Sequence, residues 1–465
     1  MKYLKIYGFS GLNRNVADFL PEQGEFLEAE NLVTTKIGVL KKTGDYEIKG
    51  AQITSSKDIL GGVDFFRADG THDHLVAIDG TNSDIYYYTG GSWTSQSLSR
   101  TATEKIRFAY SPTLDHLFAC NISDDTTGWN GSSWSTSTNL SGAPKAKFPI
   151  MFGRRLWLFN VDVGGTTYID RGYRSSLVDS GSITWDTTND WIVFDDIITG
   201  VGKNGENMFV GCENSIWTYS LADEKYQVSG HGCVSHESIT SYGKWTFWAA
   251  RDGIYTFNGG SDKKISLPIQ EYWDAIPEAN LSKIQMEVLG HNLYIYIGDL
   301  TSPSTLSNTL FVYDILQNNF NKINLADEVE NLHTYVTSSG KELFMGNDDG
   351  EIFQLFTSET QNTASFPSSI ETNWLYGSGM KYKDDWYELW GYGDKLSGLK
   401  VKYKVDDGEW KPAGELNGSI DKVDFKARGN RIKFLLEEIS KNNLYELQML
   451  QAGYVPGYTK EDDES

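Results

Sequence analysis

The sequence predicts an all-β protein, built on a β-propeller of six or seven blades and followed by a C-terminal antiparallel β-sandwich. Three observations support this prediction: the composition, a repeated pair of strands, and a repeated glycine-containing turn. The 465 residues include 26 Tyr, 22 Phe, 14 Trp and 46 Gly but only 10 Pro, which favours many short strands joined by tight turns. Long helices would instead require a sequence rich in Ala, Leu, Glu and Lys.

The repeated unit is an alternating apolar strand, a turn and an aromatic strand. Its seven copies lie at 74–78 with 85–88, 115–120 with 129, 155–159 with 168–169, 207–211 with 215–219, 244–248 with 253–257, 292–296 with 310–313, and 342–346 with 351–355. Turns of the form aromatic-x-Gly-x-Ser begin at Tyr88, Trp129 and Phe257, the first two of them 41 residues apart. A period of roughly 40–50 residues indicates propeller blades, because a β-helix repeats more tightly and a sandwich would not repeat seven times.

Composition changes set the expected domain boundaries. The blades are expected over residues 45–360, after an N-terminal segment at 1–44. Residues 357–365 are polar and predict a connector. Strands that alternate with period two then predict an antiparallel sandwich over 371–456, and an acidic, solvated tail is expected at 457–465.

Charge and cysteine content restrict the function. The chain has 41 basic and 63 acidic residues, a net charge of −22, which disfavours conventional binding of nucleic acid or of anionic membranes and keeps large assemblies soluble. Cys120, Cys212 and Cys233 are far apart and form no CxxC, so we expect buried free thiols in a reducing compartment. No signal peptide or apolar run of about 18 residues is recognised, and the protein is expected to be made in a cytosol.

The side chains capable of catalysis do not form a recognisable constellation. His72 and His74 share one side of a strand and were weighed as metal ligands, but a turn leading into a blade is favoured. His231 and His236 flank Cys233, although no third orienting group or oxyanion hole is apparent. We therefore expect no enzyme activity, no cofactor and no bound metal.

Adjacent carboxylates are a second feature that could suggest hydrolysis. The pairs begin at Asp124, Asp195, Asp348, Asp384 and Asp406. Glycoside hydrolysis requires two carboxylates across a sugar, whereas these pairs mostly lie in expected turns, where Asp accepts hydrogen bonds from nearby backbone N–H groups. The stretch 404–410 resembles the Asp-box hairpin of sialidases but favours a plain Asp-Gly hairpin.

The first 46 residues carry a family resemblance. Gly8-Phe9-Ser10-Gly11-Leu12-Asn13 is followed by Leu20-Pro21, by an acidic stretch at 25–32 that includes Asn31, and by Gly38-Val39-Leu40-Lys41-Lys42-Thr43-Gly44-Asp45-Tyr46. This succession resembles the opening of a broad group of tailed-phage virion proteins. Lys42 stands where that group commonly has Arg, Thr43 where it has Pro, and Asp45 is inserted before the Tyr.

The resemblance continues through the middle of the chain. The segments at 196–201, 208–211, 215–217, 232–239, 252–257 and 264–273 follow one another as in packaged-DNA stabilisation and tail-nozzle proteins of short-tailed phages. The resemblance implies a non-enzymatic head-to-tail connector or tail-nozzle component that forms six-fold rings with itself. Its other implied partners are the portal or adaptor, other tail proteins, and DNA that passes through without sequence-specific binding. The implied location is the virion tail, after synthesis in the host bacterial cytoplasm.

Two sets of residues follow as candidate sites. The resemblance implies an assembly role for Gly8, Gly11, Leu12, Asn13, Asn31, Lys41 and Lys42 in a segment outside the blades. The acidic turn residues Asp348, Asp349 and Glu351 are candidates for the wall of a DNA channel, with simple solubility as the alternative. The alternative function is a carbohydrate-binding propeller, such as a tail adhesin, with aromatic rings stacking on sugars.

Overall fold

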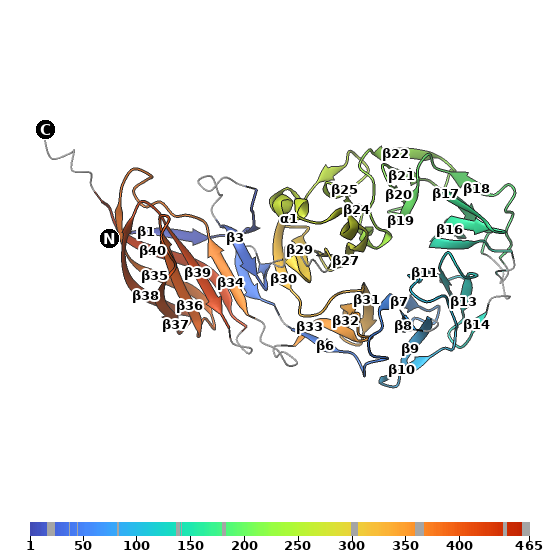
Figure 1. Cartoon of the computed structure of the whole chain (residues 1–465), viewed down its shortest axis with the longest axis horizontal. Coiled ribbons are helices and arrows are strands. Elements are labelled where there is room, and N and C mark those ends of the chain that lie inside the picture. The colour runs from blue at the N-terminus through green and yellow to red at the C-terminus, as the bar shows by residue number, and fades with distance from the viewer. Residues whose placement is uncertain are drawn as a thin grey trace.

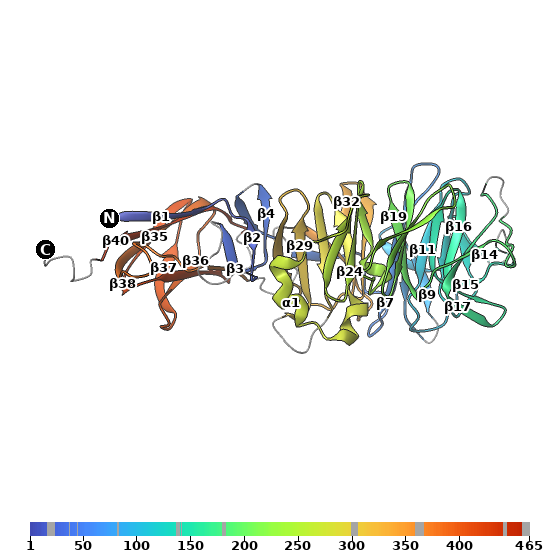
Figure 2. The ribbon, with the colours of Figure 1, turned by 90° about the horizontal axis from the view of Figure 1, so that it is seen from above.

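The computed structural model describes residues 1–15, 24–36, 38–43, 45–80, 83–135, 140, 142–178, 183–298, 306–358, 367–439 and 444–457. Seven four-stranded blades form a ring at one end of the molecule, six of them separate sheets and one part of a ten-stranded sheet, and a two-layered sandwich lies at the other end (Figure 1). Turned by 90°, the ring is a disc seen edge-on, with the sandwich extending from its rim (Figure 2). The first residue lies at the end of the sandwich away from the ring.

The seven blades follow one another along the chain. Blade 1 contains β7 (Ile59–Phe66), β8 (His72–Ile78), β9 (Asp84–Thr89) and β10 (Ser92–Ser95); blade 2 contains β11 (Arg107–Ser111), β12 (His116–Cys120), β13 (Thr127–Trp129) and β14 (Trp134–Ser135); blade 3 contains β15 (Lys145–Phe152), β16 (Arg155–Val163), β17 (Thr166–Arg174) and β18 (Trp191–Val193). Blade 4 contains β19 (Ile198–Asn204), β20 (Asn207–Cys212), β21 (Ile216–Tyr219) and β22 (Lys225–Ser229); blade 5 contains β23 (Thr240–Tyr242), β24 (Trp245–Ala250), β25 (Gly253–Phe257) and β26 (Lys263–Lys264). Blade 6 contains β27 (Gln285–Leu289), β28 (Asn292–Tyr296), β29 (Thr309–Asp314) and β30 (Asn319–Asn324); blade 7 contains β31 (Asn331–Thr337), β32 (Gly340–Gly346), β33 (Ile352–Ser358) and β6 (Asp45–Ile48).

Each repeat found in the sequence corresponds to the second and third strands of one blade. For example, the copy at 207–211 and 215–219 forms β20 and β21, which pair from Met208 with Tyr219 to Gly211 with Ile216. The predicted β-propeller is therefore confirmed, with seven blades. Buried apolar side chains of these strands form the clusters between neighbouring blades, because each blade buries both faces of its sheet.

The ring is closed by a strand that comes before the first blade in the sequence. β6 precedes blade 1 in the chain but pairs antiparallel with β33 as the outer strand of blade 7, with Ile48 opposite Phe353 and Tyr46 opposite Leu355. The innermost strands β31 and β7 lie side by side at the closure. Blade 7 thus joins two segments that are about 305 residues apart, which holds the first and last blades together.

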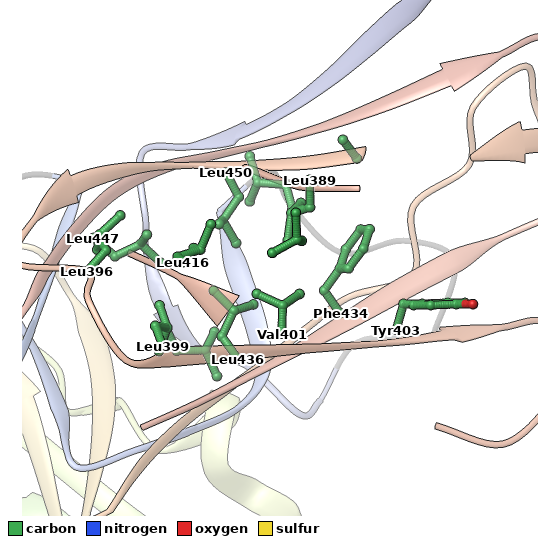
Figure 3. Close-up of a cluster of buried hydrophobic side chains, with 14 of the residues drawn as sticks. Leu389, Leu396, Leu399, Val401, Tyr403, Leu416, Phe434, Leu436, Leu447 and Leu450 are labelled. Atoms are coloured by element: carbon green, nitrogen blue, oxygen red, sulfur yellow. The ribbon is translucent and has the colours of Figure 1, made fainter. Parts of the chain in front are cut away.

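The sandwich has two layers around one apolar core. The first layer contains β38 (Ile420–Gly429), β35 (Asp384–Asp394), β40 (Glu446–Val455), β5 (Val39–Lys42) and β4 (Leu32–Lys36), with β1 (Lys2–Tyr7) also on β40. The second contains β3 (Glu25–Glu30), β34 (Ser368–Thr372), β39 (Ile432–Glu438), β36 (Leu399–Val405) and β37 (Lys411–Leu416). Leu389 and Leu450 of the first layer face Val401 and Leu436 of the second across the core (Figure 3).

The N-terminal segment forms part of the sandwich. Its described residues, up to Thr43, lie outside the blades, and β1, β3, β4 and β5 are strands of the sandwich. The physical reason is that β40 and β34 would otherwise expose unpaired edges, which these strands cover. The predicted sandwich at 371–456 is thus completed by the start of the chain. Most of the expected connector and tail, at 359–366 and 458–465, falls outside the described residues.

Helical structure is minor among the described residues. It consists of η1 (His236–Ser238), η2 (Leu267–Ile269), α1 (Gln270–Asp274) and η3 (Glu278–Lys283). None of these helices has the length and apolar character that would let it cross a membrane.

Candidate functional site

The two domains are joined by a continuous sheet. β30, the outer strand of blade 6, pairs with β2 (Gly11–Leu12) and β3, and β3 pairs with β34 of the sandwich. The result is a ten-stranded sheet that runs from the innermost strand of blade 6 to the edge of the sandwich. Backbone hydrogen bonds therefore connect the domains directly, and the joint between them is built from the segment that carries the family resemblance.

The Gly-Leu-Asn element forms the contact with blade 6. Gly11 has φ +94°, and a Cβ there would lie 2.6 Å from the carbonyl oxygen of Phe320, so only glycine allows β2 to approach β30 this closely. Leu12 is 1% exposed and packs in the same apolar cluster as Phe320 and Tyr272 of the propeller. Asn13 follows and donates a 2.7 Å hydrogen bond from Nδ2 to Oε1 of Glu25.

Asn31 forms hydrogen bonds with β30, Pro367 and Thr43. Its φ of +59° is the left-handed conformation that Asn tolerates well. Its backbone N–H donates to the carbonyl of Lys322, and its Oδ1 accepts from the backbone N–H of Asn324, so both contacts fix it to β30. Its Nδ2 donates to the carbonyl of Pro367, and its own carbonyl accepts from the backbone N–H of Thr43.

A network of charges surrounds this joint. Lys322 is 2% exposed, and its ammonium lies 2.8 Å from Glu28 and 2.9 Å from Glu30. The hydroxyl of Tyr272 donates to Glu28 and accepts a 2.9 Å hydrogen bond from Arg14. Burial and the neighbouring Glu28 carboxylate raise the pKa of Tyr272. All the charged groups therefore have partners of opposite sign, as buried charges require.

A second ion pair lies within the sandwich. Lys42 of β5 and Glu438 of β39 are each 1% exposed, and they form an ion pair across the two layers. Lys41, which precedes Lys42 in β5, points the other way. Its side chain is 39% exposed, and its ammonium lies 3.9 Å from Glu446. The alternation along β5 thus places one lysine in the interior and the other at the surface.

The structure shows where the predicted assembly residues lie. Gly11, Leu12, Asn31 and Lys42 are buried within one chain, where they contact other parts of that chain. Gly8 and Lys41 remain accessible, and Asn13 is partly so. That these residues join neighbouring subunits stays a prediction.

Replacement of Gly11 by alanine tests the joint, with Gly8→Ala as the matched control. Both glycines have positive φ, at +94° and +68°, but a Cβ on Gly8 has no atom within 4 Å. We expect Gly8→Ala to lower the free energy of unfolding by about 1 kcal/mol through backbone strain. Gly11→Ala should cost roughly 1–3 kcal/mol more because of the clash with Phe320. Equal losses in denaturant unfolding of the two variants would contradict this account.

The acidic candidates lie in the turn between the second and third strands of blade 7. Asp348, Asp349 and Glu351 line a pocket with Asp58 and Asp327, and Asp349 accepts a hydrogen bond from the backbone N–H of Ser56. Burial and nearby carboxylates raise the pKa of Glu351 and of Asp58. Because the innermost strands line the axis of the ring, these turn residues do not face the centre of their own propeller. Whether they line a channel between subunits stays a prediction.

The centre of the propeller is crossed by side chains that sequence reasoning missed. The guanidinium of Arg107 in blade 2 lies 2.7 Å from Glu237 of η1, between blades 4 and 5. Burial opposes ionisation of Glu237, but Arg107, His236 and Lys105 together outweigh it and lower the pKa of that carboxyl to about 2. Lys105 pairs similarly with Glu330 at 3.0 Å. These ion pairs join blades that are far apart in sequence.

The histidines and Cys233 are engaged in structural contacts. The thiol of Cys233 is buried, which raises its pKa to about 11, and it contacts the carbonyl of Ser235. His236 accepts a hydrogen bond from the backbone N–H of Val201, and His231 stacks on Tyr255. Within the described part of the chain, no hydrogen bond joins Cys233 to either histidine. The groups are therefore not arranged as a nucleophile and its base.

His72 and His74 do not form the predicted turn, because both lie in strand β8, where they pair with β7. His72 bonds to Asp64 at 2.8 Å, and His74 turns inward to a second buried histidine, His333. Among the described residues, no group of three or more His, Cys, Asp or Glu is arranged to hold a metal ion. The carboxylates of Asp124, Asp196, Asp349, Asp384 and Asp406 each accept hydrogen bonds from backbone N–H groups. Four of the five pairs lie in turns or bends as predicted, whereas Asp384 and Asp385 begin strand β35.

Comparisons with known proteins find only distant structural similarity. No protein-family model and no curated protein matches the chain. Solved structures that match include the WD40 β-propeller domain of Doa1, with TM-score 0.45 and 9% identity over 67% of this chain and 97% of that chain. A catalytically inactive virginiamycin B lyase from Staphylococcus aureus with quinupristin has TM-score 0.46 and 12% identity over 68% and 100%. YCF48 bound to D1 peptide has TM-score 0.41 and 12% identity over 68% and 96%.

Proposed function

We propose that this chain is a structural component of the tail of a tailed phage, a ring-forming part of the nozzle or head-to-tail connector. The observation that supports this most is the joint. The residues on which the family resemblance rests, among them Gly11 and Asn31, are those that connect propeller and sandwich through one sheet. Such a joint fixes the two domains as one stiff block, which suits a part that must withstand the pressure of packaged DNA.

The proposed DNA channel lies on the axis of a ring of copies, outside each propeller. Arg107 of blade 2 and Glu237, between blades 4 and 5, form an ion pair across the ring, which argues against passage of a duplex through the propeller itself. The acidic excess belongs to the propeller: residues 45–358 carry 39 of the 63 acidic residues but only 21 of the 41 basic ones. An acidic surface facing the channel would repel DNA at short range and let it slide, because it makes no contact that releases counterions.

The test uses particles of the phage that encodes the chain. An antibody against the full chain should detect it in density-purified, nuclease-treated particles. Particles assembled without the chain should lose their packaged DNA, and purified chain added to them should restore infectivity. Absence of the chain from purified particles would overturn the proposal. Particles that lack the chain and keep their DNA but fail to attach to cells would instead favour the adhesin function.

A further inference from the structure

The outer face of the first sandwich layer carries an unusual set of side chains. The registers of β1, β40, β35 and β38 place twelve residues on this face in three rows. The rows are Tyr3, Gly453, Glu388 and Asp424; Lys5, Gln451, Trp390 and Lys422; and Tyr7, Met449, Tyr392 and Ile420. This outer sandwich face lies on the part of the molecule farthest from the propeller ring (Figure 1).

Aromatic rings lie side by side on this face. Trp390 and Tyr392 occupy positions i and i+2 of β35, with ring centroids 6.4 Å apart and ring planes within 23° of each other. They point outward because Leu389 and Gly391, which alternate with them, point into the core. Tyr3 and Tyr7 on β1 are 44% and 52% exposed, which adds two more rings at the edge of the face.

Polar groups beside the rings are held in fixed positions. The carboxylate of Glu388 accepts a 2.8 Å hydrogen bond from the hydroxyl of Tyr3 and a 3.1 Å hydrogen bond from the ammonium of Lys422. Gly453 lies between them, and a Cβ there would be 2.7 Å from Cγ of Glu388 and 3.1 Å from Cε1 of Tyr3. Glycine at this position therefore makes room for Tyr3 and Glu388 to lie flat against the sheet.

The size of the face indicates what could bind it. Four strands span about 14 Å, and the three rows extend about 13 Å along the strands, so the face covers on the order of 200 Å². A stable interface between two proteins buries about 800 Å² on each partner, several times the area of these three rows. Flat aromatic rings flanked by a few fixed polar groups instead suit a small, flat, polar ligand.

We propose that the outer sandwich face binds a neutral oligosaccharide. The rings of Trp390 and Tyr392 stack against the C–H faces of consecutive sugar rings, while Glu388, Lys422 and Gln451 form hydrogen bonds with the hydroxyl groups. The face has no net charge, because the two cations Lys5 and Lys422 balance Glu388 and Asp424. We therefore expect its ligand to be neutral. This inference is independent of the proposed role in a phage tail, and it concerns the sandwich instead of the blades.

The experiment measures binding of the purified full chain to an array of neutral and acidic oligosaccharides of two to six sugars. We expect the native chain to bind neutral members, and Trp390→Ala and Tyr392→Ala each to weaken that binding by about tenfold or more. The matched control is Trp191→Ala on the outer strand of blade 3, which removes a ring that is 39% exposed and should leave binding unchanged. Trp390→Phe keeps a ring and should retain most of the affinity.

Three outcomes would overturn the inference. The first is that no neutral oligosaccharide binds the native chain at millimolar concentration. The second is that Trp390→Ala binds as well as the native chain while its thermal unfolding is unchanged. The third is that sedimentation detects self-association of the native chain which Trp390→Ala abolishes, since a second copy would then cover the face. None of these outcomes bears on whether the chain is present in phage particles, so the two proposals fail separately.

Discussion

Replacement of Lys42 by methionine is expected to lower the free energy of unfolding by about 3–5 kcal/mol. Lys42 and Glu438 are each 1% exposed and form an ion pair inside the sandwich. Removal of the ammonium leaves the Glu438 carboxylate buried next to an apolar side chain, and the charge can no longer be solvated. Denaturant unfolding followed by circular dichroism measures the loss.

The matched control is Lys41→Met, at the neighbouring position of the same strand. Lys41 is 39% exposed and lies 3.9 Å from Glu446, so its loss should change stability by less than about 1 kcal/mol. The double variant Lys42→Met with Glu438→Leu should recover much of the stability, because no unpaired charge remains. Equal effects of the Lys41 and Lys42 variants would contradict a buried ion pair.

Acidification is expected to weaken the closure of the ring between blades 1 and 7. His74 and His333 are buried there with their Nε2 atoms 2.7 Å apart, and Nδ1 of His333 lies 2.7 Å from Oδ1 of Asn331. The network therefore assigns Nδ1–H to His333 and Nε2–H to His74, with both rings neutral. Burial lowers the pKa of His333 to about 3, and burial, then His333 and Lys49, lower that of His74 well below its ordinary value.

The sign of the effect follows from these shifts. Both folded-state pKa values lie below the unfolded value of about 6.5, so the unfolded chain binds more protons below that pH. Stability from the pair is complete above about pH 6.5 and falls as the pH decreases towards 3. The loss is up to about 1.4 kcal/mol per pH unit for each histidine.

The slope of stability against pH is the measurement that isolates the pair. The double variant His74→Gln with His333→Gln should have a smaller slope than the native chain between pH 6.5 and 4.5, whatever its absolute stability. His291→Gln, at an exposed position beside Asp314, should keep the native slope. An unchanged slope in the double variant would mean that acid acts elsewhere, for example on the carboxylates.

The blades could be predicted because their signal is local. In strands such as β20 and β28, buried side chains and short turns recur within a few residues, so the second and third strands of every blade were found. The innermost strands were harder to recognise, since β7 contains Gly61 and Gly62 and faces neighbouring blades instead of alternating. This is why the sequence alone left the number of blades at six or seven.

The joint could not be predicted because its partners are distant in sequence. Leu12 pairs with Phe320, and Lys42 meets Glu438 almost 400 residues later. No periodicity in the first 44 residues indicates which edge each short strand will cover. Two other contacts are long-range in the same way: His74 with His333, and Arg107 with Glu237. A resemblance marked the N-terminal residues as important, but their burial depends on tertiary packing.

The closing strand β6 has a consequence for how the chain is synthesised. Its partner β33 leaves the ribosome about 305 residues later, and β40, the partner of β1, about 450 residues later. At about 5–20 residues per second, β6 waits roughly 15–60 s for its partner. During that time the nascent chain carries unpaired strand edges that invite aggregation, because the propeller cannot close before β33 is made, nor the sandwich before β40 is made. We therefore expect the synthesis of these late strands, and not the folding of single blades, to set the time at which each domain becomes native.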